Sequence, residues 1–146
     1  MFKRNRLLVI MRFGCRIETQ LSVFSENKPG RMAKICYTLG NMGVNIYCIS
    51  VHDTVDHSII RLIVDNPTKA LILLEEDGLY IITQKVVVVD ISNDVGALGE
   101  ISTLLARADD NMEYAYCTAS PNHDTAHLVI KTKDPERTLD ILQDES

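Results

Sequence analysis

The sequence predicts an α+β fold of two tandem units that share an antiparallel sheet with helices on one face. Three observations predict it. The chain repeats itself at an offset of 66 residues, so that Gly30 falls on Gly96. Short β-branched segments alternate with segments of helical period. Finally, 46% of the 146 residues are hydrophobic and no tract is of low complexity, so each unit can bury a core.

The repeat is plainest where each unit begins. Residues 21–30 align with residues 87–96 without a gap, which places Asn27 on Asn93. Further matches are Val23 with Val89, Ile35 with Ile101, Leu39 with Leu105 and Asn45 with Asn111, and, after a two-residue insertion, Pro67 with Pro135 and Leu71 with Leu139. Because the aligned positions also share predicted structural roles, we interpret the repeat as two copies of one structural unit.

The first unit reads β-α-β-β-α-β. Residues 20–25 are rich in β-branched side chains and predict a strand, and residues 32–42 carry apolar side chains at helical spacing, ended by Gly43. Residues 44–53 and 58–64 predict a hairpin around a polar turn. Asn66 followed by Pro67 is typical of a helix start, and residues 79–83 predict the closing strand.

The second unit repeats this order with strands at 85–91, 112–119 and 126–132 and helices at 98–108 and from Asp134 onward. The sequence ends at Ser146, so we expect this unit to lack its last strand, through a truncated terminus or with the N-terminal segment partly covering the edge. The order is the split βαβ of ferredoxin-like folds. We place the units at 18–84 and 85–146. Residues 1–17 are expected to be a peripheral extension, either a misread leader before Met11 or an extra edge strand.

Composition excludes several classes of partner. The net charge is −5, and the basic residues cluster only at Lys3, Arg4 and Arg6, which argues against nucleic acid. The apolar run at 7–11 is too short for a signal peptide, and no stretch could span a bilayer, so no membrane partner is expected. The four cysteines are widely spaced, which favours a reduced, cytoplasmic location.

No catalytic, cofactor or metal motif emerges. The chain lacks a nucleophile elbow, a phosphate loop and a dinucleotide fingerprint. His52 and His57, with Cys48 or Cys117, suggest a metal hypothesis, but coherent ligand spacing is absent, so surface histidines are the better interpretation. We expect no enzyme activity, no cofactor and no metal.

The segment Asn27-Lys28-Pro29-Gly30, followed by a helix and then Gly43-Val44-Asn45-Ile46, closely resembles the ACT domain family, and the likeness covers roughly residues 18–144. ACT domains are regulatory modules of aspartokinase, prephenate-processing enzymes and phosphoglycerate dehydrogenase. The resemblance implies that a small free amino acid binds between two units that lie side by side. The partners it implies are that ligand and either a metabolic enzyme or a second copy of the chain.

The resemblance also implies a set of ligand-binding residues, with Asn27 facing Asn111 and Asn93 facing Asn45. The full set is Asn27, Lys28, Pro29, Gly30, Arg31, Met32, Asn45, Asn93, Gly96, Ala97, Leu98 and Asn111. An Asn amide both donates and accepts hydrogen bonds, helix N-termini bind anions, and glycine allows close approach. The second unit departs from the pattern at Val95 and at Asp109-Asp110, so we favour the Asn27 site.

Three alternatives stay open. Asn27 and Asn93 could be helix caps, and the glycines could serve only a tight turn. The fold could carry an enzyme of the acylphosphatase kind, for which Arg31 is a lone candidate cation, or the chain could be a structural subunit that binds nothing.

We further expect the two units to pair through residues 44–53 and 112–119. The residues expected to set the selectivity for one amino acid are Ser25, Met32, Tyr47, Ile49 and Tyr114.

Overall fold

The computed structural model describes residues 14–144 and divides the chain into two compact units. The first-repeat unit is Thr19–Gln84. The second-repeat unit combines the chain from Lys85 onward with the N-terminal part up to Glu18. Residues 1–13 of the expected extension lie outside the described residues.

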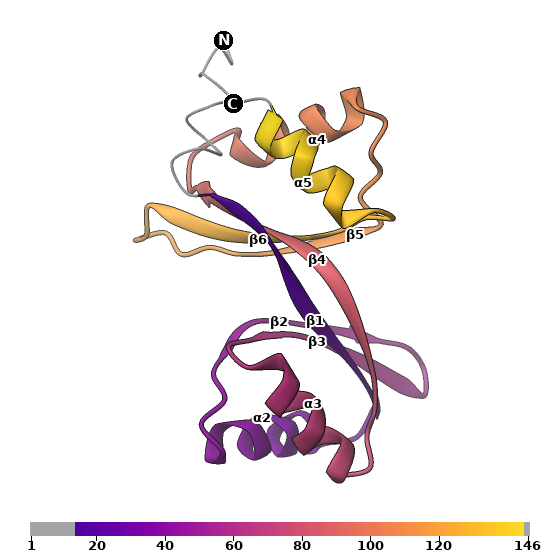
Figure 1. Ribbon diagram of the computed structural model, residues 1–146. Coiled ribbons are helices and arrows are strands. Elements are labelled where there is room, and N and C mark those ends of the chain that lie inside the picture. Colours follow the sequence, from indigo (N-terminus) through magenta and orange to yellow (C-terminus); the bar gives the residue numbers. More distant parts are fainter. Residues whose placement is uncertain (1–13, 145–146) are drawn as a thin grey trace. The chain divides into compact units, whose positions relative to one another are not determined.

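The element order expected for the first repeat is confirmed (Figure 1). It consists of β1 (Cys15–Glu26), α2 (Arg31–Asn41), β2 (Ile46–Asp53), β3 (His57–Val64), α3 (Pro67–Glu76) and β4 (Tyr80–Ser92). The Asn66 side chain accepts a hydrogen bond from the Lys69 N–H at 3.1 Å, with Pro67 at the first helical position, as its sequence predicts. Strand β4 runs without a break from the last strand of repeat one into the first strand of repeat two.

The second repeat follows with α4 (Ala97–Arg107), β5 (Tyr114–Thr118), β6 (Thr125–Lys131) and α5 (Pro135–Asp144). The hydrogen-bonded strand order is β2-β3-β1-β4-β6-β5. Strands β2 and β5 are therefore the two end strands, and the expectation that they pair within the chain is wrong. The physical reason is that β1 and β4 each run through both units and so take the central positions.

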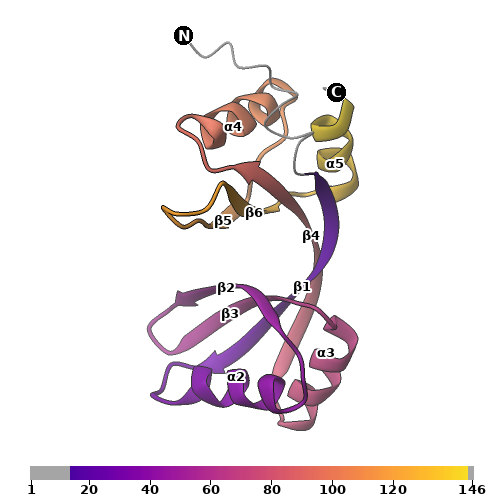
Figure 2. The same cartoon turned by 90° about the vertical axis from the view of Figure 1, so that its left-hand side faces the viewer.

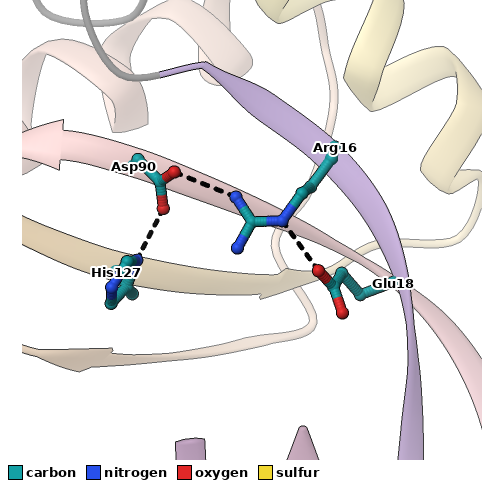
Figure 3. A network of polar contacts seen from close by, with 4 residues as sticks. All are labelled: Arg16, Glu18, Asp90 and His127. Atoms are coloured by element: carbon teal, nitrogen blue, oxygen red, sulfur yellow. Dashed lines mark hydrogen bonds and ion pairs between the residues drawn. The ribbon is translucent and has the colours of Figure 1, made fainter. Parts of the chain in front are cut away.

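The second-repeat unit obtains a fourth strand from the beginning of β1, which neighbours β4. The Asp90 N–H donates to the Gly14 carbonyl at 3.0 Å, and the Arg16 guanidinium contacts Asp90 at 2.9 Å and Glu18 at 2.7 Å. Asp90 also contacts His127 Nδ1 on β6 at 2.5 Å, which makes a four-residue network (Figure 3). Among the described residues no strand follows α5, as the sequence predicts, and the N-terminal segment lies beside β4, which is the second of the two alternatives.

In each unit the two helices cover one face of its strands (Figures 1 and 2). Alternate strand residues point toward the helices and pack with the apolar stripe of each helix. The buried core of the first-repeat unit comprises Leu21, Val23, Ile35, Leu39, Val44, Ile60, Leu62, Val64, Ala70 and Leu74. That of the second-repeat unit comprises Val87, Val89, Ile91, Ala97, Ile101, Leu104, Leu105, Ala126, Leu128, Ile130 and Leu142.

The ends of the first helix of each repeat are built alike. Gly43 takes the left-handed conformation (φ 76°), as its sequence predicts, and Asp109 does so at the same position of repeat two (φ 53°). Lys69 Nζ donates to the Met42 carbonyl at 2.6 Å, and the Arg137 guanidinium donates to the Ala108 carbonyl at 2.5 Å. The repeat seen in the sequence therefore extends to individual hydrogen bonds.

Candidate functional site

The loop between β1 and α2 leaves the N-terminus of α2 without a side-chain cap. Gly30 is the N-cap residue, in the left-handed conformation with φ 85°, and no side chain accepts a capping hydrogen bond. The first helical bond runs from the Lys34 N–H to the Gly30 carbonyl at 3.0 Å. The N–H groups of Met32 and Ala33 lie before this first helical bond and have no acceptor within the helix, so they can donate to a bound anion.

A pocket of about 150 Å³, which we call the Asn27 pocket, lies beside this loop within the first-repeat unit. Its volume is below the roughly 300–1,000 Å³ of pockets for drug-sized ligands, so it suits a small molecule. The pocket is lined by Ser25, Glu26, Asn27, Lys28, Arg31, Met32, Val51, Asp53, Ser58 and Ile60.

Strand register arranges part of this lining in two rows. Ser25 of β1 pairs with Ser58 of β3, and Ser58 pairs with Asp53 of β2, which makes a polar row across three strands. The Ser58 hydroxyl donates to Asp53 Oδ1 at 2.5 Å. Two residues further along the same strands, Ile60 pairs with Val51 and forms an apolar row. Side chains two apart point to one face, so both rows face the pocket.

The charged side chains of the pocket come from two parts of the chain, the segment from the end of β1 to the start of α2 and the end of β2. Glu26, the last residue of β1, contacts Lys28 Nζ at 2.8 Å and the guanidinium of Arg31, the first residue of α2, at 3.3 Å. The hydrogen bond from Lys28, with the positive charges of Lys28 and Arg31, holds the pKa of Glu26 below its usual value. On the strands, Asp53 forms no ion pair among the described residues, since its contact is the neutral Ser58 hydroxyl. The pocket lining thus includes two cations and two carboxylates, of which only Glu26 is paired with the cations.

Four of the residues predicted for the first site line this pocket: Asn27, Lys28, Arg31 and Met32. Pro29 and Gly30 shape the loop between them. A Cβ on Gly30 would meet no atom within 4 Å, so the positive φ, and not a lack of space, is what favours glycine here. Asn45 lies beyond the other end of α2, where its N–H donates to the Asp65 carboxylate at 3.0 Å.

Sequence reasoning missed the four lining residues contributed by the hairpin. These are Val51, Asp53, Ser58 and Ile60. Of the residues expected to set selectivity, Ser25 and Met32 line the pocket, whereas Tyr47, Ile49 and Tyr114 are not among its lining residues. The available signal was the alternation of the hairpin strands, which puts Asp53 and Ser58 on the same face as the buried Ile60.

At the corresponding loop of the second-repeat unit, Asn93 ties down a turn. Its Nδ2 donates to the Ser120 carbonyl at 2.7 Å and to the His123 carbonyl at 3.0 Å. For Asn27 the structure gives no such side-chain bond; only its backbone matches, with Asn27 N–H to Asp56 O at 3.5 Å and Asn93 N–H to Asp124 O at 2.8 Å. Neither asparagine caps its helix, because Gly30 and Gly96 occupy the cap positions.

The other residues predicted for the second site are mostly apolar or lie elsewhere. Gly96 has φ 90°, Ala97 is buried and Leu98 is 48% exposed. The row that matches Ser25 and Ser58 is Ile91 paired with Ala126, and the position that matches Asp53 is Ala119. Asn111 lines a separate pocket of about 350 Å³ beyond the C-terminus of α4, together with Asp109 and Asp110.

The Cys15 and Cys117 thiols do not have the lowered pKa of an activated nucleophile. Burial raises the pKa of the Cys15 and Cys117 thiols, which keeps them protonated at neutral pH. Within residues 14–144, no three His, Cys, Asp or Glu side chains are grouped so as to hold a metal ion. No helix in the same range has the length and hydropathy needed to cross a bilayer.

Known protein structures share the fold of this chain. The chain resembles protein BT0572 of Bacteroides thetaiotaomicron, with 27% identity, a TM-score of 0.83 and 90% of each chain covered. It shares its fold with the ligand-free regulatory subunit of aspartate kinase from Thermus thermophilus, with 17% identity, a TM-score of 0.67, and 90% of this chain and 95% of that one covered. A regulatory domain of aspartate kinase from Porphyromonas gingivalis, described as putative, gives 17% identity and a TM-score of 0.57, with 90% and 95% covered.

The sequence matches none of the curated proteins with which it was compared. The sequence profile of the ACT domain pair, by contrast, matches residues 17–145, which span both repeats. The profile, the repeated βαββαβ order and the shared fold agree. The chain therefore belongs to the family of ACT domain pairs.

Proposed function

We propose that this protein is a non-catalytic cytoplasmic regulator that binds one free amino acid per chain in the Asn27 pocket. The observation that carries the proposal is the division of charge in that pocket. The open N-terminus of α2, with Lys28 and Arg31, suits the carboxylate of an amino acid, and Asp53 opposite suits its ammonium group. Asn27 can serve either group through its amide.

The count of one ligand per chain rests on the differences between the repeats. Positions that match Arg31, Asp53 and Ser58 are Ala97, Ala119 and Ala126 in the second repeat. The amide of Asn93 is already engaged by two carbonyl groups. A zwitterion placed there would lack the guanidinium that Arg31 offers its carboxylate and the carboxylate that Asp53 offers its ammonium group, which costs free energy in a desolvated site.

A regulatory role is supported by the kind of protein that shares this fold. The Thermus thermophilus neighbour is a regulatory subunit of aspartate kinase, and another similar structure contains the alpha and beta subunits of aspartokinase. We propose that ligand occupancy is passed to an enzyme of amino-acid metabolism, or to an assembly of the chain with itself.

The proposal is tested by a thermal-shift screen of the twenty amino acids, followed by calorimetric titration of the wild type, Asn27→Ala and Asn93→Ala. A ligand at 100 times its Kd stabilises the native state by about 2.7 kcal/mol. We expect one site per chain, about a tenfold to hundredfold weaker in Asn27→Ala, because a hydrogen bond to a charged group is lost. Asn93→Ala should bind as the wild type does.

Three results would count against the proposal. Wild-type affinity in Asn27→Ala would remove Asn27 from the site. Two equal sites per chain would contradict the asymmetry between repeats. A screen in which no amino acid raises the melting temperature would favour a structural subunit instead.

A further inference from the structure

The Asn27 pocket has a third feature, an apolar wall directly beside its polar row. Val51 and Ile60 face each other across β2 and β3, and Met32 in the first turn of α2 completes the wall. Ile60 is only 2% exposed, whereas Val51 and Met32 are 47% and 42% exposed. The wall is therefore anchored in the core and open where a ligand can cover it.

The two rows are about 7 Å apart, because each residue of a strand advances the chain by about 3.3 Å. An α-amino acid whose ammonium group lies at Asp53 would direct its side chain along the strands toward Val51 and Ile60. No charged residue lines the pocket on that wall. A second charge on the ligand would be desolvated there without a partner, whereas an aliphatic side chain would gain by covering Met32 and Val51.

We infer that the Asn27 pocket selects a neutral aliphatic L-amino acid of the valine, leucine, isoleucine or methionine class, with Asp53 as the acceptor for its ammonium group. The inference rests on the proposed function and adds the ligand class and the residues that decide it. Asp53 distinguishes amino acids from other small carboxylates, and the wall of Met32, Val51 and Ile60 distinguishes among amino acids.

The role of Asp53 is tested with pairs of ligands that differ only at the α-carbon. The full chain is titrated with each aliphatic amino acid and with the 2-oxo acid of the same carbon skeleton, which lacks the ammonium group. The wild type should prefer the amino acid by about tenfold to a hundredfold. Asp53→Asn should lose most of that preference by weakening the amino acid alone. An unchanged preference in a folded Asp53→Asn variant, checked by its circular dichroism, would overturn the assignment.

The apolar wall is tested by a change of preference. Val51→Glu should weaken aliphatic ligands and improve lysine or arginine relative to them, because the new carboxylate faces the ligand side chain. Cys117→Glu is the matched control, since Cys117 occupies the corresponding strand position of repeat two, opposite Leu128. It should leave every affinity unchanged.

The outcomes separate the two claims. If the wild type binds a charged or aromatic amino acid at least as tightly as the aliphatic ones, the inference is wrong while the proposed function stands. If no amino acid binds, both fail together. Equal effects of Val51→Glu and Cys117→Glu would place the ligand elsewhere and overturn the inference.

Discussion

The two repeats share a backbone arrangement but differ in chemistry at a buried cluster of three matched positions. In the first repeat, Val44, Val64 and Ala70 are apolar and belong to the core. The matching residues of the second repeat are Asp110, Thr132 and Thr138, all less than 9% exposed. Thr138 Oγ1 lies 2.6 Å from the Asp110 carboxylate and 2.6 Å from Thr132 Oγ1.

This difference shows that the backbone arrangement can be retained while the chemistry of a buried cluster changes. The C-terminal ends of α2 and α4 and their hydrogen bonds match in the two repeats, although one buried cluster is apolar and the other polar. A buried carboxylate is tolerated when every side of it has a partner, and Arg137 at 3.7 Å adds a further one. The core cluster of the first repeat is apolar, and the polar row of the Asn27 pocket lies at its loop end.

The largest expected effect comes from the matched leucines at the centre of each core. Leu39 and Leu105 are 0% and 1% exposed. The Leu39 carbonyl accepts the Val44 N–H, and the Leu105 carbonyl accepts the Asp110 N–H in the same way. Leu39→Ala and Leu105→Ala should each lower the free energy of unfolding by about 2–5 kcal/mol, through lost transfer energy and the cavity left behind. Urea denaturation measures both. A loss below 1 kcal/mol at either position would show that the two cores are not equally packed.

The buried polar cluster gives the next largest effect. Thr138→Val removes the hydroxyl beside the Asp110 carboxylate and should destabilise the protein by about 1–3 kcal/mol. The triple variant Asp110→Val, Thr132→Val, Thr138→Ala copies the residues of the first repeat and should recover most of that loss. Chemical denaturation of both variants decides the matter. If the triple variant is less stable than the single one, the two repeats are not interchangeable here.

The two asparagines offer a smaller contrast. Asn93→Ala loses two hydrogen bonds to the Ser120 and His123 carbonyls and should cost about 1–2 kcal/mol of stability. Asn27→Ala removes no side-chain hydrogen bond that the structure gives, so its unfolding midpoint without ligand should stay close to that of the wild type. Thermal and urea melts compare them, and an equal loss in both variants would contradict the contrast.

The smallest effect is a pH dependence confined to the first repeat. The folded-state pKa of Glu26 is lowered, chiefly by the hydrogen bond from Lys28, so Glu26 stabilises the protein above its unfolded pKa, near the usual value of 4.5. That contribution is lost as the pH falls through the lowered folded value. Glu26→Gln should therefore be slightly less stable than the wild type at pH 6, and this difference in stability should vanish in acid. Denaturation midpoints from pH 6 to pH 3 test this, with Ser92→Ala, the matched position, as a pH-independent control.

Local sequence determined most of the elements. Apolar spacing, the Asn66-Pro67 start and the turn residues fixed the helices and hairpins to within a few residues, because those signals depend on near neighbours alone. The loop residues Asn27, Lys28, Arg31 and Met32 were also within reach, since they are contiguous with the motif. The family resemblance rested on the same short segments.

The tertiary structure alone decided two matters. The first is the fourth strand of the second-repeat unit, which comes from residues 15–18, far from that repeat in the sequence. The second is the meeting of Ser25, Ser58 and Asp53 in one row. Three strands contribute that row, and which residues face each other depends on register. Alternation along the hairpin places Asp53 and Ser58 on the same face as Ile60, but their position beside Ser25 depends on register, which is set by the packing of whole strands against a core.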